Sequence, residues 1–189
     1  MVQEFSSLLK DKQQGFDLHQ SVRDSEGNER FLKVDRNEAA VRTDIQKMAV
    51  DVANEVTGQT FHERVAWVDR QKKIGNKFVE DGKLDEALQE YTKCLCALDF
   101  GTCKGPKPTD DQVAMVDRDV KVSLLNNMAL CLNKQGHAER AIKMLDQVLD
   151  IDEFNTKALS RKMHYLFAAG LLDPLRKLVK LVRLNPASY

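Results

Sequence analysis

The stretch Ile74-Gly75-Asn76-Lys77-Phe78, followed by Gly82, Ala87 and Tyr91, decides the fold. These residues fit a 34-residue helix-turn-helix repeat at positions 7 to 11, 15, 20 and 24. In such a repeat, small residues at positions 8 and 20 let two helices approach closely, and a glycine at position 15 ends the first helix in the left-handed conformation at low steric cost. The stretch therefore predicts a hairpin of two helices.

The same register recurs twice downstream. With Gly136 and Gly170 at position 15, Ala129 and Met163 occupy position 8 and lie 34 residues apart, which is the repeat period itself. The three predicted hairpins cover residues 68–99, 122–153 and 156–189. We therefore expect an all-α chain, a right-handed superhelical solenoid of three hairpins with an N-terminal helical extension.

Two features depart from the standard repeat length. Gly75 and Ala129 lie 54 residues apart, an excess of 20 over the period. The extra residues include glycines and prolines that cannot continue a helix smoothly, so they predict an elaborated loop near 99–118 with longer flanking helices. Thr60 and Glu63 have the spacing of a capping box, so the first helix of the first hairpin is expected to begin early, directly after Thr60.

The sequence divides into an N-terminal extension, residues 1–59, and a repeat domain, residues 60–189. Apolar residues three or four positions apart predict a helix near 36–56 with one apolar stripe. The stripe consists of Val41, Ile45, Met48, Val52 and Val56. Upstream, Glu26-Gly27-Asn28-Glu29 is predicted to form a turn between two short strands.

The composition argues against several function classes. Basic and acidic residues number 29 each, for a formal net charge of +0, which is untypical of a general nucleic-acid binder. The longest apolar run, 165–172, is too short to span a membrane, and the N-terminus has no secretion signal. The four cysteines form no Cys-x-x-Cys pair and the histidines have no ligand spacing. We therefore expect reduced thiols, no metal or cofactor, no enzymatic activity and a cytoplasmic location.

The first helices of the hairpins are expected to line the concave face of the solenoid. At the inward positions they carry Lys72 and Asn76, then Asn127, then Lys157 and Arg161. Each cation-containing pair is spaced i, i+4, so its members share one helix face. Three cations and two amides aimed at one place suit a short anionic peptide that ends in a free carboxylate. Candidate accessory residues of the groove are Lys73, Lys134 and Phe78.

The repeats and these five polar residues resemble the tetratricopeptide repeat domain of co-chaperones. In that family Lys, Asn, Asn, Lys and Arg at the matching positions form a two-carboxylate clamp for the C-terminal Glu-Glu-Val-Asp of heat shock protein 90 or heat shock protein 70. The long connection after the first repeat, and the segment from Leu125 to Cys131, are most similar to large immunophilins and aryl-hydrocarbon-receptor-interacting-protein relatives. The resemblance covers residues 61 to 189 and implies an adaptor or co-chaperone whose partner is a chaperone C-terminal peptide.

A function of a different class stays open. The chain could be a structural scaffold subunit of a larger assembly in which the clamp is not used. The helix predicted at 172–184 has more apolar residues than one neighbouring helix can cover, so it is a candidate surface for a client or for self-association. Neither a nucleic acid nor a membrane is expected as a partner.

Overall fold

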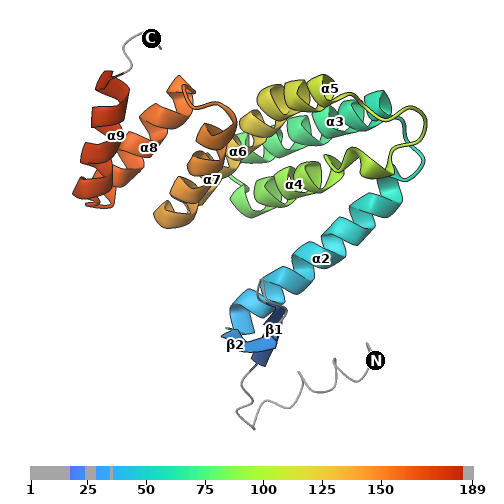
Figure 1. The fold of residues 1–189 in the computed structure, drawn as a ribbon, viewed down its shortest axis with the longest axis horizontal. Coiled ribbons are helices and arrows are strands. Elements are labelled where there is room, and N and C mark those ends of the chain that lie inside the picture. The colour runs from blue at the N-terminus through green and yellow to red at the C-terminus, as the bar shows by residue number, and fades with distance from the viewer. Residues whose placement is uncertain (1–17, 24–28, 35, 185–189) are drawn as a thin grey trace. The chain divides into compact units, whose positions relative to one another are not determined.

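The fold is that of a computed structural model of the chain (Figure 1). The structure describes residues 18–23, 29–34 and 36–184. It divides into two compact units, Met1–Lys47 and Met48–Tyr189, which are described separately. The boundary predicted from the sequence at residue 59 stays a prediction.

The first unit contains a two-stranded antiparallel sheet. Strand β1, Leu18–Arg23, pairs with β2, Glu29–Val34, so that Leu18 lies opposite Val34. The turn predicted at Glu26 to Asn28 lies outside the described residues. Helix α2, Arg36–Val56, begins in this unit and covers the range whose apolar spacing predicts a helix.

The first hairpin consists of α3, Phe61–Glu80, and α4, Leu84–Ala97, which pack side by side (Figure 1). The predicted capping box is present at the start of α3. The Glu63 backbone N–H donates to Thr60 Oγ1, and the Thr60 backbone N–H donates to Glu63 Oε2 at 2.8 Å. Gly82 follows the helix with a φ of 77°, the left-handed conformation that a glycine adopts without strain.

The prediction of a loop over all of 99–118 is wrong for the second half of that range. After a short turn of 3-10 helix, η1 at Phe100–Thr102, the chain becomes helical again at α5, Asp110–Val116. Thr109 caps this helix and forms a second capping box with Gln112. A π-helical turn, η2 at Asp117–Lys121, joins α5 to α6 without a break. The insertion therefore mainly lengthens the first helix of the second hairpin.

The remaining helices complete the repeats. The second hairpin pairs α6, Val122–Lys134, with α7, Ala138–Ile151, and the third pairs α8, Thr156–Ala168, with α9, Leu172–Leu184. Neighbouring hairpins pack through α4 against α6 and through α7 against α8. The predicted all-α solenoid of three helix hairpins is confirmed for the repeats.

Three apolar clusters form the core of the second unit. The first joins Val52 and Val56 of α2 to the first hairpin and to α5 and α6. It also contains Cys94 and Cys131, so the prediction that these thiols pack between helices is confirmed. The second cluster lies between the second hairpin and α8, and the third, the smallest, consists of Leu159, Leu166 and Leu178 with partly buried neighbours.

The last helix is better covered than its sequence predicts. Leu178 is buried, and Leu175 and Val182 pack against the same cluster on α8. Among the side chains that the structure describes in this hairpin, the exposed large apolar ones are Phe167 near the end of α8, at 68%, and Leu171 and Leu172 at the turn, at 39% and 49%. In the part of the chain that the structure describes, no helix combines the length and apolar character needed to cross a membrane.

Candidate functional site

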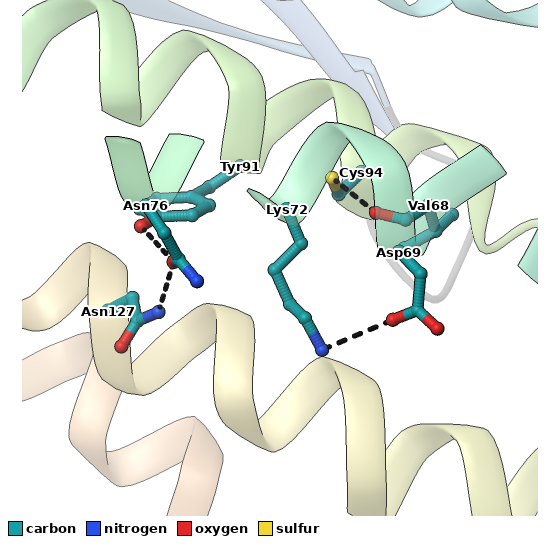
Figure 2. Close-up of polar contacts among 7 residues, drawn as sticks. All are labelled: Val68, Asp69, Lys72, Asn76, Tyr91, Cys94 and Asn127. Atoms are coloured by element: carbon teal, nitrogen blue, oxygen red, sulfur yellow. Dashed lines mark hydrogen bonds and ion pairs between the residues drawn. The ribbon is translucent and has the colours of Figure 1, made fainter. Parts of the chain in front are cut away.

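Helix α3 carries the first two candidate residues. Lys72 and Asn76 are one turn apart, and Figure 2 shows both side chains reaching from α3 toward the helix that carries Asn127. The Lys72 side chain is 20% exposed, and its Nζ lies 3.3 Å from Asp69 Oδ1, one turn earlier. The first cation of the candidate clamp is therefore held in a local ion pair with a carboxylate.

The two candidate asparagines are in direct contact. Asn127 Nδ2 donates a hydrogen bond to Asn76 Oδ1 at 3.0 Å, although the residues lie 51 positions apart in the sequence. The same oxygen accepts a second hydrogen bond, at 2.7 Å, from the hydroxyl of Tyr91 on α4. Figure 2 shows the three side chains meeting at this oxygen. Residues from three helices of two repeats thus converge on one amide.

Helix α8, from the third repeat, is the fourth helix that reaches this place. Arg161 Nη1 donates to the backbone oxygen of Asn126 at 2.7 Å, directly beside Asn127. Because a guanidinium has five N–H donors, most of them stay available after this contact. Lys157 lies one turn before Arg161 and is exposed to solvent.

The charges around this region act on buried ionisable groups. Burial raises the pKa of the Cys131 thiol, and the positive charges of Lys134 and Arg161 partly oppose that rise. Burial also raises the pKa of the Tyr91 phenol to about 12. Lys134 on α6 and Arg161 on α8 therefore make a shared positive field at the Cys131 thiol, one turn after Asn127.

The three accessory candidates have different surroundings. Lys134 belongs to this positive field, and Lys73 is exposed on α3 beside Lys72. Phe78 is partly buried against the first core cluster, and Lys83 Nζ lies 6.0 Å from its ring centroid. This contact gives Phe78 a packing role and does not bring it to the asparagine pair.

Sequence reasoning missed two residues that touch the candidate site. It placed Tyr91 at position 24 of the repeat and gave it no part in the site. The glycine at position 8 next to an asparagine at position 9 is nevertheless a usable signal that a large residue from α4 could reach that asparagine. It also did not consider Asp69, although its i, i+3 spacing to Lys72 is the ordinary signal of a helical ion pair. Within the described residues, no cluster of three or more His, Cys, Asp or Glu could hold a metal ion.

Comparison with known proteins identifies the fold. No family model matches the chain. The C-terminal tetratricopeptide-containing domain of a Plasmodium falciparum protein described as FK506-binding superposes with a TM-score of 0.54 at 26% identity, over 66% of this chain and 81% of that domain. The hairpins have the fold of a tetratricopeptide repeat domain. The first and second such domains of Spaghetti (RPAP3), solved with the HSP90 peptide SRMEEVD, have TM-scores of 0.46 and 0.45 at 24% and 23% identity, a likeness too distant to indicate a shared ligand.

The curated relatives that this chain matches are large immunophilins. The peptidyl-prolyl cis-trans isomerase FKBP42 of Arabidopsis thaliana is 33% identical over 62% of the chain, and the FK506-binding protein 59 of Drosophila melanogaster is 27% identical over 87%. The chain spans 31% and 35% of the length of these two relatives. The matches cover their tetratricopeptide regions and not their isomerase domains.

Proposed function

We propose that the chain is an adaptor or co-chaperone that binds the C-terminal Glu-Glu-Val-Asp of a heat shock protein 90 or heat shock protein 70 class chaperone. The observation that supports this most directly is the contact of Asn76 with Asn127, with Arg161 bound to the neighbouring backbone. Three hairpins each contribute a donor or a cation to one region. A terminal aspartate, with two carboxylates close together, is a compact ligand for such a set.

Each proposed residue has a chemical role. Carboxylates only accept hydrogen bonds, so Lys72, Lys157 and Arg161 supply charge-assisted donors and the two asparagines supply amide N–H donors. Losing one charge-assisted bond costs roughly 1.5–3 kcal/mol. A five-residue ligand makes few other contacts, so we expect an affinity of about micromolar, near −8 kcal/mol.

The decisive experiment compares two peptides. Isothermal titration with Met-Glu-Glu-Val-Asp should give about micromolar binding, and its C-terminally amidated twin should bind on the order of tenfold more weakly or worse. Equal affinities for the two peptides would reject a site that reads the free carboxylate. Raising the salt concentration should also weaken the acid form, because exposed charges are screened over about 8 Å at physiological ionic strength.

Point variants locate the site. Lys157→Ala and Arg161→Ala should each weaken binding by about tenfold or more, because each removes a cation from the ligand. Lys143→Ala, which removes an exposed lysine from α7, is the matched control and should bind as the wild type does. If Lys157→Ala and Arg161→Ala both bind with unchanged affinity, the carboxylate lies elsewhere.

The same experiments distinguish the adaptor from the second candidate function, that of a structural scaffold subunit. A scaffold subunit that does not use the clamp would show no dependence on a free carboxylate, whereas its apolar residues at the turn of the last hairpin, Leu171 and Leu172, would be covered in the assembly. We further propose that the chain acts in the cytoplasm and has no enzymatic activity of its own, as expected of a repeat domain that binds peptides.

A further inference from the structure

The Asn76 amide is held in a defined orientation. Its oxygen accepts two hydrogen bonds, from Tyr91 and from Asn127, and a carbonyl oxygen has two lone pairs. Both lone pairs are therefore occupied. Among the described residues, the structure gives the Asn76 nitrogen no acceptor, so its two N–H donors stay available.

We propose that Tyr91 is a positioning residue of the groove, whose buried hydroxyl keeps the Asn76 amide turned with its nitrogen toward the ligand. This inference rests on the proposed function. A carboxylate needs donors, and an amide turned by half a rotation would present its oxygen to the carboxylate and repel it. Removing the hydroxyl leaves one of the two constraints on that rotation.

The tyrosine is itself placed by a glycine. Tyr91 is fully buried, and its ring lies against the backbone of α3 at Gly75. A Cβ at Gly75 would lie 2.7 Å from Tyr91 Cε1, closer than real contacts allow. Only a glycine lets the ring approach far enough for its hydroxyl to reach the next residue, Asn76. The residues that pack the hairpin thus also orient the ligand-facing amide.

A purely structural role makes a different prediction. If Tyr91 only fills the core, Tyr91→Phe keeps the ring and changes stability alone. If it orients Asn76, Tyr91→Phe should weaken the binding of Met-Glu-Glu-Val-Asp about three- to tenfold, the range expected for loss of one neutral hydrogen bond. Thr92→Val is the matched control, since it removes a hydroxyl from the same helix, and within the described part of the chain that hydroxyl bonds only to Leu88 O.

A double-mutant cycle tests whether Tyr91 affects peptide binding through Asn76. Tyr91→Phe introduced into an Asn76→Ala background should change the affinity for the peptide less than twofold, because the amide it orients is gone. The same three- to tenfold loss in both backgrounds would overturn the inference, and so would unchanged affinity of Tyr91→Phe in the wild-type background.

Nuclear magnetic resonance gives a readout that needs no ligand. In the wild type the Tyr91 hydroxyl proton should exchange slowly with water, and the Asn76 side-chain amide signals should shift in Tyr91→Phe but not in Thr92→Val. A rapidly exchanging hydroxyl in the wild type would overturn the inference even if a variant fails to fold, and unshifted Asn76 amide signals in folded Tyr91→Phe would overturn it as well. Failure of the wild type to bind the acid peptide would instead reject the proposed function, and with it the binding role of Tyr91. Whether Tyr91 orients the Asn76 amide would still be decided by the Asn76 side-chain amide signals.

Discussion

Gly75→Ala is the sharpest single test of the packing that supports the candidate site. Gly75 is buried in the middle of α3, where helix propensity alone favours alanine by about 0.5–1 kcal/mol. The added Cβ would lie 2.7, 3.0 and 3.2 Å from three ring atoms of Tyr91, Cε1, Cδ1 and Cζ. The ring cannot move away freely, because Tyr91 is fully buried between α3, α4 and the rest of the first core cluster.

The size of the effect follows from these two opposing contributions. Forcing an extra methyl group into a packed core costs about 1–3 kcal/mol. After subtracting the gain in helix propensity, we expect Gly75→Ala to lower the free energy of unfolding by about 0.5–2 kcal/mol. For a domain of this size that corresponds to a fall in Tm of about 1–8 °C. Displacing the ring should also break the hydrogen bond to Asn76 and weaken peptide binding.

Thermal unfolding followed by circular dichroism measures the change, with two comparisons that identify its cause. Tyr91→Leu removes the ring atoms near Gly75, so Gly75→Ala should cost clearly less in that background. Gly82→Ala is the control: Gly82 has a φ of 77° with nothing within 4 Å of an added Cβ, so its cost, about 1–2 kcal/mol from backbone strain, should not depend on Tyr91. A Gly75→Ala protein as stable as the wild type, or an equal cost in both backgrounds, would refute the reasoning.

Three further changes have defined outcomes. Asp69→Asn should raise the affinity for the acid peptide about two- to fivefold at low salt in a calorimetric titration, because it frees Lys72 from an ion pair worth about 0.2–1 kcal/mol; a loss of affinity would contradict this. Thr60→Ala should destabilise the domain to urea by about 1 kcal/mol through loss of the cap on α3, whereas an unchanged urea midpoint would show that the cap is not needed. Folding raises the pKa of the Cys94 thiol and of the Tyr91 phenol to about 12, from ordinary values near 9 and 10. The folded state then holds these protons more tightly than the unfolded state does. Their contribution to the free energy of unfolding is therefore complete below about pH 9 and is lost as the pH rises toward 12. The urea midpoint should be lower at about pH 10.5 than at about pH 8, and equal midpoints would speak against this pH dependence.

Much of the fold could be predicted because the repeat is a local pattern. The glycine at position 15 and the small residues at positions 8 and 20 recur at fixed spacing, so the helix hairpins follow from one register. The predicted loop extended too far, over the helical stretch at 110–118, because prolines and glycines just before that stretch dominate the composition of the insertion. The capping box of Thr109 and Gln112, and the buried residues Val116 and Val120, were nevertheless present in the sequence as signals of a helix.

The candidate site was predictable in its positions and not in its contacts. Counting along the repeat puts Asn76 and Asn127 on inward faces of successive hairpins, and the structure has them in hydrogen-bond contact. The register says nothing about distances between side chains of different helices, so the link from Tyr91 to Asn76 required three-dimensional packing. The ion pair of Asp69 with Lys72 is local, and a search for neighbouring charges on the same helix would have found it.

The two halves of the proposed clamp are supported unequally. The asparagine pair rests on the first core cluster, the largest of the three, through Gly75 and Tyr91. Lys157 and Arg161 instead belong to α8, which packs on the preceding repeat through Ala158 and Tyr165 of the second cluster, whereas the cluster inside the last hairpin is the smallest. The ion pair of Lys162 with Asp146 and the hydrogen bond from Arg161 to the backbone of α6 add polar contacts between α8 and that repeat. Segments with little buried apolar surface open locally at lower free energy than the rest of a domain. A ligand that contacts both the asparagine pair and the two cations on α8 stabilises the state in which α8 is packed on the preceding repeat. Part of its binding free energy would therefore hold the last hairpin against α6.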